Sequence, residues 1–153
     1  MRRFISRILA IAILAAASVV AFTGSASAST PSGCSDVRQF GPTAYVTVGG
    51  QTAASLKQYY SPACHEAFGY LWVWDSFRAS HSGWNVKLRE CGPVGASNPW
   101  CNTPATWSNV SSQEFWSNPN YVNYCPASNM DAFVEFAYNQ YDEIQTTDLA
   151  QAC

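Results

Sequence analysis

The residues that are best suited to bind a ligand lie in an aromatic segment near the middle of the chain. Residues 70–77 read Tyr-Leu-Trp-Val-Trp-Asp-Ser-Phe, a composition that favours a β-strand. Because alternate residues of a strand point to opposite faces, Tyr70, Trp72 and Trp74 share one face. Indole and phenol rings offer a broad apolar surface with a polar edge, which suits stacking on sugar rings. The segment therefore predicts either a ligand platform or, as large aromatic residues commonly form, part of the core.

A neighbouring segment supplies cations that could complete such a platform. Residues 84–90 alternate between an apolar side, which includes Trp84, and a polar side that ends in Arg89. We expect this strand to pair with residues 70–77 as a hairpin, because a turn-like segment joins them. The polar side would then join the aromatic face, where its donors could bind sugar hydroxyls. The predicted ligand-binding residues are Tyr70, Trp72, Trp74, Lys87 and Arg89.

Catalytic patterns are scarce in this chain. Asp75 and Glu90 lie on the two predicted strands and could act as the acid pair of a small hydrolase, with the pKa of Asp75 raised by burial. The sequence has no G-x-S-x-G, H-E-x-x-H or P-loop pattern. It also lacks the C-x-x-C and D-x-D-x-D-G patterns of zinc and calcium sites. We therefore predict a non-catalytic protein with no catalytic residue, no metal and no cofactor.

Six cysteines, all beyond residue 28, indicate a disulfide framework. An even number of cysteines in an exported chain is typical of disulfide-bonded domains, in which each bridge contributes about 2–4 kcal/mol. Other connectivities stay open, but proximity along the chain favours three bridges: Cys34–Cys64, Cys91–Cys101 and Cys125–Cys153.

The first 28 residues predict a secretory signal peptide. Three arginines precede an apolar run, residues 8–22, which leads to the small-x-small sequence Ala26-Ser27-Ala28. The run is shorter than the roughly 20 residues that span a bilayer, so we expect cleavage after Ala28 rather than an anchor. Residues 29–153 would then form a single extracellular domain without membrane contact.

Composition and charge narrow the possible partners. The chain is 48% hydrophobic and only 12% charged, which argues against disorder. Loss of residues 1–28 would leave five basic and ten acidic residues, a net charge of −5. Such a domain has no electrostatic reason to bind nucleic acid or an anionic membrane. The expected partner is a glycan or an extracellular protein.

Short strands between turn signals predict an all-β fold. Residues 43–48 and 51–60 flank Gly49-Gly50 and should form a hairpin that Ser61-Pro62 ends. Residues 132–141 alternate with a high aromatic content, which favours a strand over a helix.

The remaining segments are assigned to loops and short elements. Residues 91–109 read as a Pro/Gly-rich loop, and residues 111–116 as a helical turn with Ser111 as its N-cap. Residues 121–125 favour a short strand, and residues 146–153 a short helix or coil. The expected fold is a small disulfide-stabilised barrel or sandwich with at most short helices.

The end of the second predicted strand has a familiar pattern. A strand that ends in Tyr60-Ser61-Pro62-Ala63-Cys64, followed by an aromatic strand, resembles the small secreted actinobacterial proteins grouped under a domain of unknown function, DUF2690 (YjfA-like). That family shows an Arg and a Trp soon after this cysteine, where this chain has His65 and Phe68. Because the family has no assigned activity, the resemblance implies a secreted, disulfide-bonded β domain and no catalytic residues.

These observations favour a secreted non-catalytic module that binds cell-wall or environmental polysaccharide through the aromatic face. A second hypothesis is a secreted protein-interaction factor, such as an inhibitor or a toxin-like effector, which would use the loop closed by Cys91 and Cys101 as a rigid binding loop. A small hydrolase that uses Asp75 and Glu90 is the third.

Overall fold

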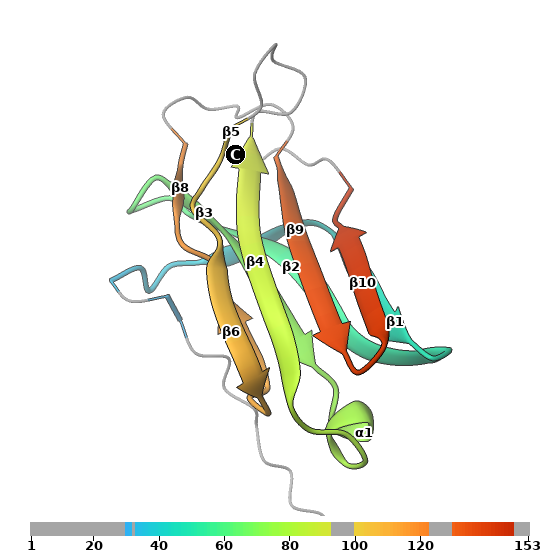
Figure 1. Cartoon of the computed structure of the whole chain (residues 1–153). Helices are drawn as coiled ribbons and strands as arrows, with labels where there is room; N and C mark the ends of the chain where they lie inside the picture. The colour runs from blue at the N-terminus through green and yellow to red at the C-terminus, as the bar shows by residue number, and fades with distance from the viewer. Residues whose placement is uncertain (1–29, 32, 93–99, 123–129, 149–153) are drawn as a thin grey trace, which may run out of the picture.

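Two antiparallel sheets packed face to face make up the described part of the chain (Figure 1). The computed structural model describes residues 30–31, 33–92, 100–122 and 130–148, so the predicted signal peptide lies outside it. Sheet A has the order β1-β2-β3-β7, with β8 also paired to β3; sheet B has the order β10-β9-β4-β5, with β6 also paired to β4. Neither sheet closes on itself within these residues, so the predicted all-β domain is a sandwich rather than a barrel.

The strand bounds follow the chain in two groups. Sheet A contains β1 (Arg38–Val48), β2 (Gln51–Ser61), β3 (Glu66–Val73), β7 (Glu114–Trp116) and β8 (Asn120–Tyr121). Sheet B contains β4 (Trp84–Gly92), β5 (Trp100–Cys101), β6 (Ala105–Val110), β9 (Asp131–Tyr138) and β10 (Tyr141–Thr146). The short helix α1 (Asp75–Arg78) lies between β3 and β4.

The hairpin of β1 and β2 is confirmed. Gly49 and Gly50 form the turn with φ values of 57° and 83°, a left-handed pair that suits a two-residue hairpin loop. The second strand ends at Ser61, because Pro62 has no N–H to continue the ladder.

The core lies between the two sheets and contains the apolar side of every long strand. Leu71 and Val73 of β3 and Trp84, Val86 and Leu88 of β4 are buried together, as the alternation predicts. The sheets approach closely at Gly69, where an added Cβ would lie 3.2 Å from the Ala132 Cβ and 3.3 Å from the Arg89 carbonyl oxygen.

The predicted hairpin of residues 70–77 and 84–90 is wrong. β3 ends at Val73, α1 follows, and β4 belongs to the opposite sheet. The helix buries Phe77 in the core and turns the chain from one layer to the other, as Figure 1 shows at the end of the sandwich where β4 begins. The two segments therefore meet face to face through their apolar sides instead of edge to edge.

Two further expectations are corrected, and one strand that the sequence did not predict is present. Residues 111–116 contain no helical turn, because Phe115 is buried while Glu114 and Trp116 point outward from β7, which pairs with β3. The expected loop at 91–109 contains β5 and β6, and residues 93–99 lie outside the described residues. Residues 141–146 form a separate strand, β10, that pairs with β9. Of the strand predicted at 121–125, β8 contains Tyr121 alone, Val122 follows it outside the strand, and residues 123–125 lie outside the described residues.

Two of the predicted disulfides are confirmed. Cys34 is bonded to Cys64 beside the β2–β3 turn, and Cys91 is bonded to Cys101 across β4 and β5. The third pair, Cys125–Cys153, lies outside the described residues. Such bonds are compatible with an extracellular location. A search of the described residues finds no helix with the length and apolar character that a membrane crossing requires.

Candidate functional site

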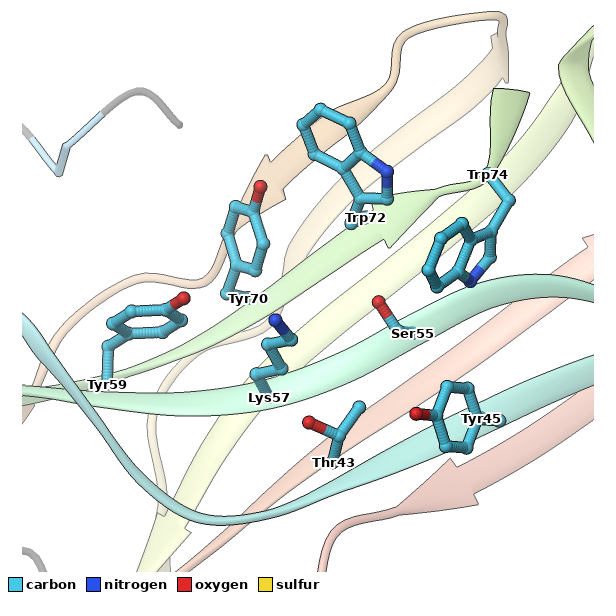
Figure 2. Close-up of a pocket in the computed structure, with 8 residues that line it drawn as sticks. All are labelled: Thr43, Tyr45, Ser55, Lys57, Tyr59, Tyr70, Trp72 and Trp74. Carbon is cyan, nitrogen blue, oxygen red and sulfur yellow. The ribbon is translucent and has the colours of Figure 1, made fainter. Parts of the chain in front are cut away.

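A pocket of about 340 Å³ lies on the outer side of sheet A (Figure 2). Its walls come from three neighbouring strands and the residue that follows β3. We call the eight lining residues the aromatic face: Thr43, Tyr45, Ser55, Lys57, Tyr59, Tyr70, Trp72 and Trp74. The volume falls at the low end of the range for small-molecule sites, so the pocket suits a ligand about the size of one sugar unit.

Strand alternation and register place these side chains together. Tyr45, Ser55 and Trp72 are direct partners across β1, β2 and β3, so they form one row over the sheet. Ser55, which has a small side chain, lies between Tyr45 and Trp72 in this row. The strands of Tyr45 and Trp72 are two interstrand distances apart, which is about 10 Å. The row is therefore open between its two rings. The next row contains Lys57 opposite Tyr70.

One end of the aromatic face is a fixed cluster of rings. The Tyr70 ring lies 5.5 Å from the Tyr59 ring and 4.5 Å from the Trp116 ring, measured between centroids. Tyr70 is only 3% exposed, and its hydroxyl group donates a hydrogen bond of 3.2 Å to Glu114. Burial, followed by the nearby charge of Glu114, raises the pKa of Tyr70. Burial also raises the pKa of Tyr59, so both phenols stay neutral.

The other end presents rings that are not packed against each other. Tyr45 is 55% exposed, Trp74 is 41% exposed, and Trp72 is partly buried. The part of the chain that the structure describes shows no ring–ring contact for these three side chains, in contrast to Tyr70. The backbone N–H of Trp74 donates to the Ala53 carbonyl oxygen at 2.9 Å, which holds Trp74 beside β2 although β3 has ended. Three rings are therefore held in place with surface to offer a ligand.

Lys57 is the charged member of the aromatic face. Figure 2 shows its side chain rising between Tyr59, Tyr70 and Ser55. Across the residues that the structure describes, its ammonium group has no carboxylate partner. The pocket is therefore positively charged although the whole chain is acidic.

The predicted cations Lys87 and Arg89 lie elsewhere. Both are on the outer side of sheet B, where the Lys87 Nζ is 2.8 Å from a carboxylate oxygen of Glu135 and the Arg89 Cζ is 4.2 Å from the centre of the Phe133 ring. Their predicted grouping with Tyr70, Trp72 and Trp74 is wrong, because β4 and β3 belong to different sheets. The grouping of those three aromatic residues on one face is confirmed.

The acid pair of the hydrolase hypothesis is not assembled. Asp75 is exposed in α1, where it accepts hydrogen bonds from Arg78 at 3.0 Å and from Gln113 at 2.8 Å. Glu90 is fully buried near the opposite end of β4, and burial, together with the charge of Asp131, raises its pKa well above the ordinary value. The two carboxyl groups therefore lie at opposite ends of the sandwich, as the places of α1 and β5 in Figure 1 show.

One cluster has the composition of a metal site but not its chemistry. The ligand atoms of Cys34, Cys64 and Glu66 lie within 4.8 Å of one another. Because the two sulfur atoms are joined in a disulfide, they have no thiolate to offer a metal ion.

Sequence reasoning missed the half of the site that β1 and β2 supply. Ser55, Lys57 and Tyr59 alternate with Leu56 and Gln58, so the period-two signal for an outward face was present. It does not reveal which strand lies beside which. The pairing of β2 with β3 brings Lys57 to the position that was assigned to Lys87 and Arg89.

No protein-family model matches the chain, and no significant match is found among curated proteins or among solved structures. The resemblance of Tyr60–Cys64 to the DUF2690 proteins therefore stays a prediction.

Proposed function

We propose that the protein is a secreted, non-catalytic binding module that holds a cell-wall or environmental polysaccharide on the aromatic face. The observation that carries the proposal is the pocket whose rim holds Tyr45, Trp72 and Trp74 without ring partners among the described residues. A folded domain gains nothing from leaving such rings in water, whereas the flat faces of sugar rings can cover them. Export is supported by the predicted signal peptide and the two disulfides.

The chemistry of the lining favours binding over catalysis. The phenols of Tyr59 and Tyr70 stay neutral, and the carboxyl groups that a hydrolase would need lie apart. Neutral hydroxyl groups beside apolar rings match the alternating hydroxyl and C–H surfaces of a sugar. For the alternative of a rigid loop closed by Cys91 and Cys101, residues 93–99 lie outside the described residues, and no observation favours it.

The test removes the two indoles of the rim. We expect the double variant Trp72→Ala, Trp74→Ala to lose tenfold or more of its affinity, because central aromatic contacts carry about 1–2 kcal/mol or more each. Binding is measured as depletion of the mature domain from solution by insoluble cellulose, chitin and bacterial cell wall. Near-UV circular dichroism and thermal unfolding report whether the fold is kept.

Trp100 supplies a matched control. It is 51% exposed but lies on β5, away from the aromatic face, so Trp100→Ala should bind as the unchanged protein does. The single variant Trp74→Ala removes an exposed ring and tests the site even if the double variant unfolds. Unchanged binding by a folded Trp74→Ala and double variant would overturn the proposal.

A further inference from the structure

The aromatic face holds a cation that the protein itself does not neutralise. Lys57 lies in the middle strand of the face, opposite Tyr70 and beside Ser55 in the next row. Among the residues that the structure describes, no carboxylate is paired with it. The lining of the pocket contains three tyrosines, two tryptophans, two small hydroxyl residues and this one ammonium group.

Three other cations of the described residues each have a partner within the protein. Arg78 is 3.0 Å from Asp75, Lys87 is 2.8 Å from Glu135, and Arg89 lies over the Phe133 ring. Arg78 and Lys87 have 34% and 42% of their side-chain surface exposed, so water screens their ion pairs. Lys57 lies in a concave site walled by rings, where charge interactions are stronger because less water surrounds them. Lys57 is thus the cation that lines the pocket, and no ion pair of the described residues includes it.

One acid on the same side of sheet A, Glu114, lies beside the pocket lining but does not belong to it. Glu114 lies on β7 opposite Trp72, two strands from β2, and it accepts the hydrogen bond from the Tyr70 hydroxyl group. It is absent from the pocket lining. Among the residues that line the pocket, Lys57 therefore supplies the one charge.

We infer that the polysaccharide is acidic, with a carboxylate on its sugar units that Lys57 binds while the ring stacks on Trp72 or Trp74. This inference rests on the proposed function and names its ligand class. A single ammonium group matches one negative charge, and its compact shape accepts a carboxylate oxygen without the two-pronged geometry that arginine demands. The carboxylate of a uronic acid is attached directly to the sugar ring, so charge and stacking surface arrive together in a pocket sized for one unit.

The experiment compares two forms of one polymer. Polygalacturonate carries the carboxylate, and its fully methyl-esterified form carries a neutral ester on the same ring. We expect the mature protein to prefer the acid by about tenfold at low salt and to lose much of that preference at 0.5 M salt, as order-of-magnitude effects of a single charged contact. Lys57→Gln should reduce the preference to near onefold, and the matched control Lys87→Gln on sheet B should keep it.

Other results of this experiment would overturn the inference, the proposed function or both. Equal binding of the acid and the ester overturns the inference and leaves the proposed function in place, as does a preference that survives Lys57→Gln. Binding of dextran sulfate in place of polygalacturonate overturns the assignment of a carboxylate. If the protein binds neither polymer and also none of the insoluble glycans, the proposed function fails and this inference fails with it.

Discussion

The outer sides of the two sheets obey the same strand alternation but differ in chemistry. On sheet B, Lys87 is paired with Glu135, and the guanidinium group of Arg89 lies over the Phe133 ring. On sheet A, the rings of Trp72 and Trp74 and the ammonium group of Lys57 are left unmatched around a pocket. A surface that only has to stay in water can satisfy its own charges. The proposed function uses these groups of sheet A, which have no partner among the described residues.

The inner sides of the sheets, by contrast, are alike. Each contributes apolar side chains to one core. Each also buries one long polar side chain, Gln58 on β2 and Glu90 on β4, and these two side chains have nearly the same size and shape. Stability should therefore depend on both inner sides equally, and function on one outer side. The following predictions test that separation.

The largest change in stability is expected from a buried tryptophan, compared with an exposed one. Trp84 is fully buried against Phe77 and Phe136, so Trp84→Ala should lower the free energy of unfolding by about 3–5 kcal/mol. Trp74→Ala removes an exposed ring and should change it by about 0.5 kcal/mol. Urea unfolding followed by far-UV circular dichroism measures both. Similar losses in the two variants would show that the aromatic face is structural.

The two described disulfides close loops of different length, so they should reduce the entropy of the unfolded chain by different amounts. Cys34–Cys64 spans 30 positions beside sheet A, and Cys91–Cys101 spans 10 positions within sheet B. The chain-entropy relation gives about 3.6 kcal/mol for the first and about 2.7 kcal/mol for the second. Replacing each pair by alanines should therefore lower the unfolding free energy more for Cys34 and Cys64. The reverse order in urea unfolding would indicate that native-state contacts, not loop length, set the contribution.

Much of the fold could be predicted from local signals. The hairpin around Gly49-Gly50 and the alternation within β4 and within β9 depend on residues close in the sequence, and each described disulfide joins cysteines that are consecutive along the chain. The assignment of β3 and β4 to opposite sheets could not, because an apolar strand side fits an edge pairing or a face packing equally well. Residues 114–116 show the same limit, since only pairing with β3 makes them a strand.

The residues of the candidate site also differ in how far the sequence predicts their position. Tyr70, Trp72 and Trp74 lie on one strand, so their common face follows from a period of two. Lys57 reaches them only through the pairing of β2 with β3, which is a contact between segments that the sequence does not rank. Lys87 and Arg89 were plausible from residue type alone, but type does not tell which layer a strand joins.

The buried acid of sheet B predicts that the stability of the fold depends on pH. Both carboxyl oxygens of Glu90 are buried and, among the described residues, without a hydrogen-bond partner. Burial and the nearby Asp131 raise the folded-state pKa of Glu90 above its ordinary value of 4.5, so the folded state retains a proton that the unfolded state releases. The contribution of Glu90 to stability is therefore fully present below about pH 4.5 and is lost as pH rises through its folded-state pKa.

Replacing Glu90 with glutamine puts a neutral side chain at the buried position of sheet B. Sheet A already has a buried glutamine, Gln58. We expect Glu90→Gln to flatten the decline of unfolding free energy as the pH rises above about 4.5, which for one proton amounts to at most about 1.4 kcal/mol per pH unit. Burial also raises the pKa of Asp131, so a residual slope of the same sign should remain. The control is Glu135→Gln on the outer side of sheet B. If Glu90→Gln retains the full slope, Glu90 is not the group that titrates.

The smallest effect is expected from the ion pair on the outer side of sheet B. Lys87 and Glu135 are each more than one-third exposed, so water screens their attraction. A double-mutant cycle of Lys87→Gln and Glu135→Gln, measured by urea unfolding, should give a coupling of about 0.2–1 kcal/mol. Lys57→Gln on sheet A should cost no more, because no protein charge pairs with it in the described residues. A coupling well above 1 kcal/mol would mean that sheet B uses its outer charges to hold the fold, and the contrast between the two outer sides would then concern stability as well as binding.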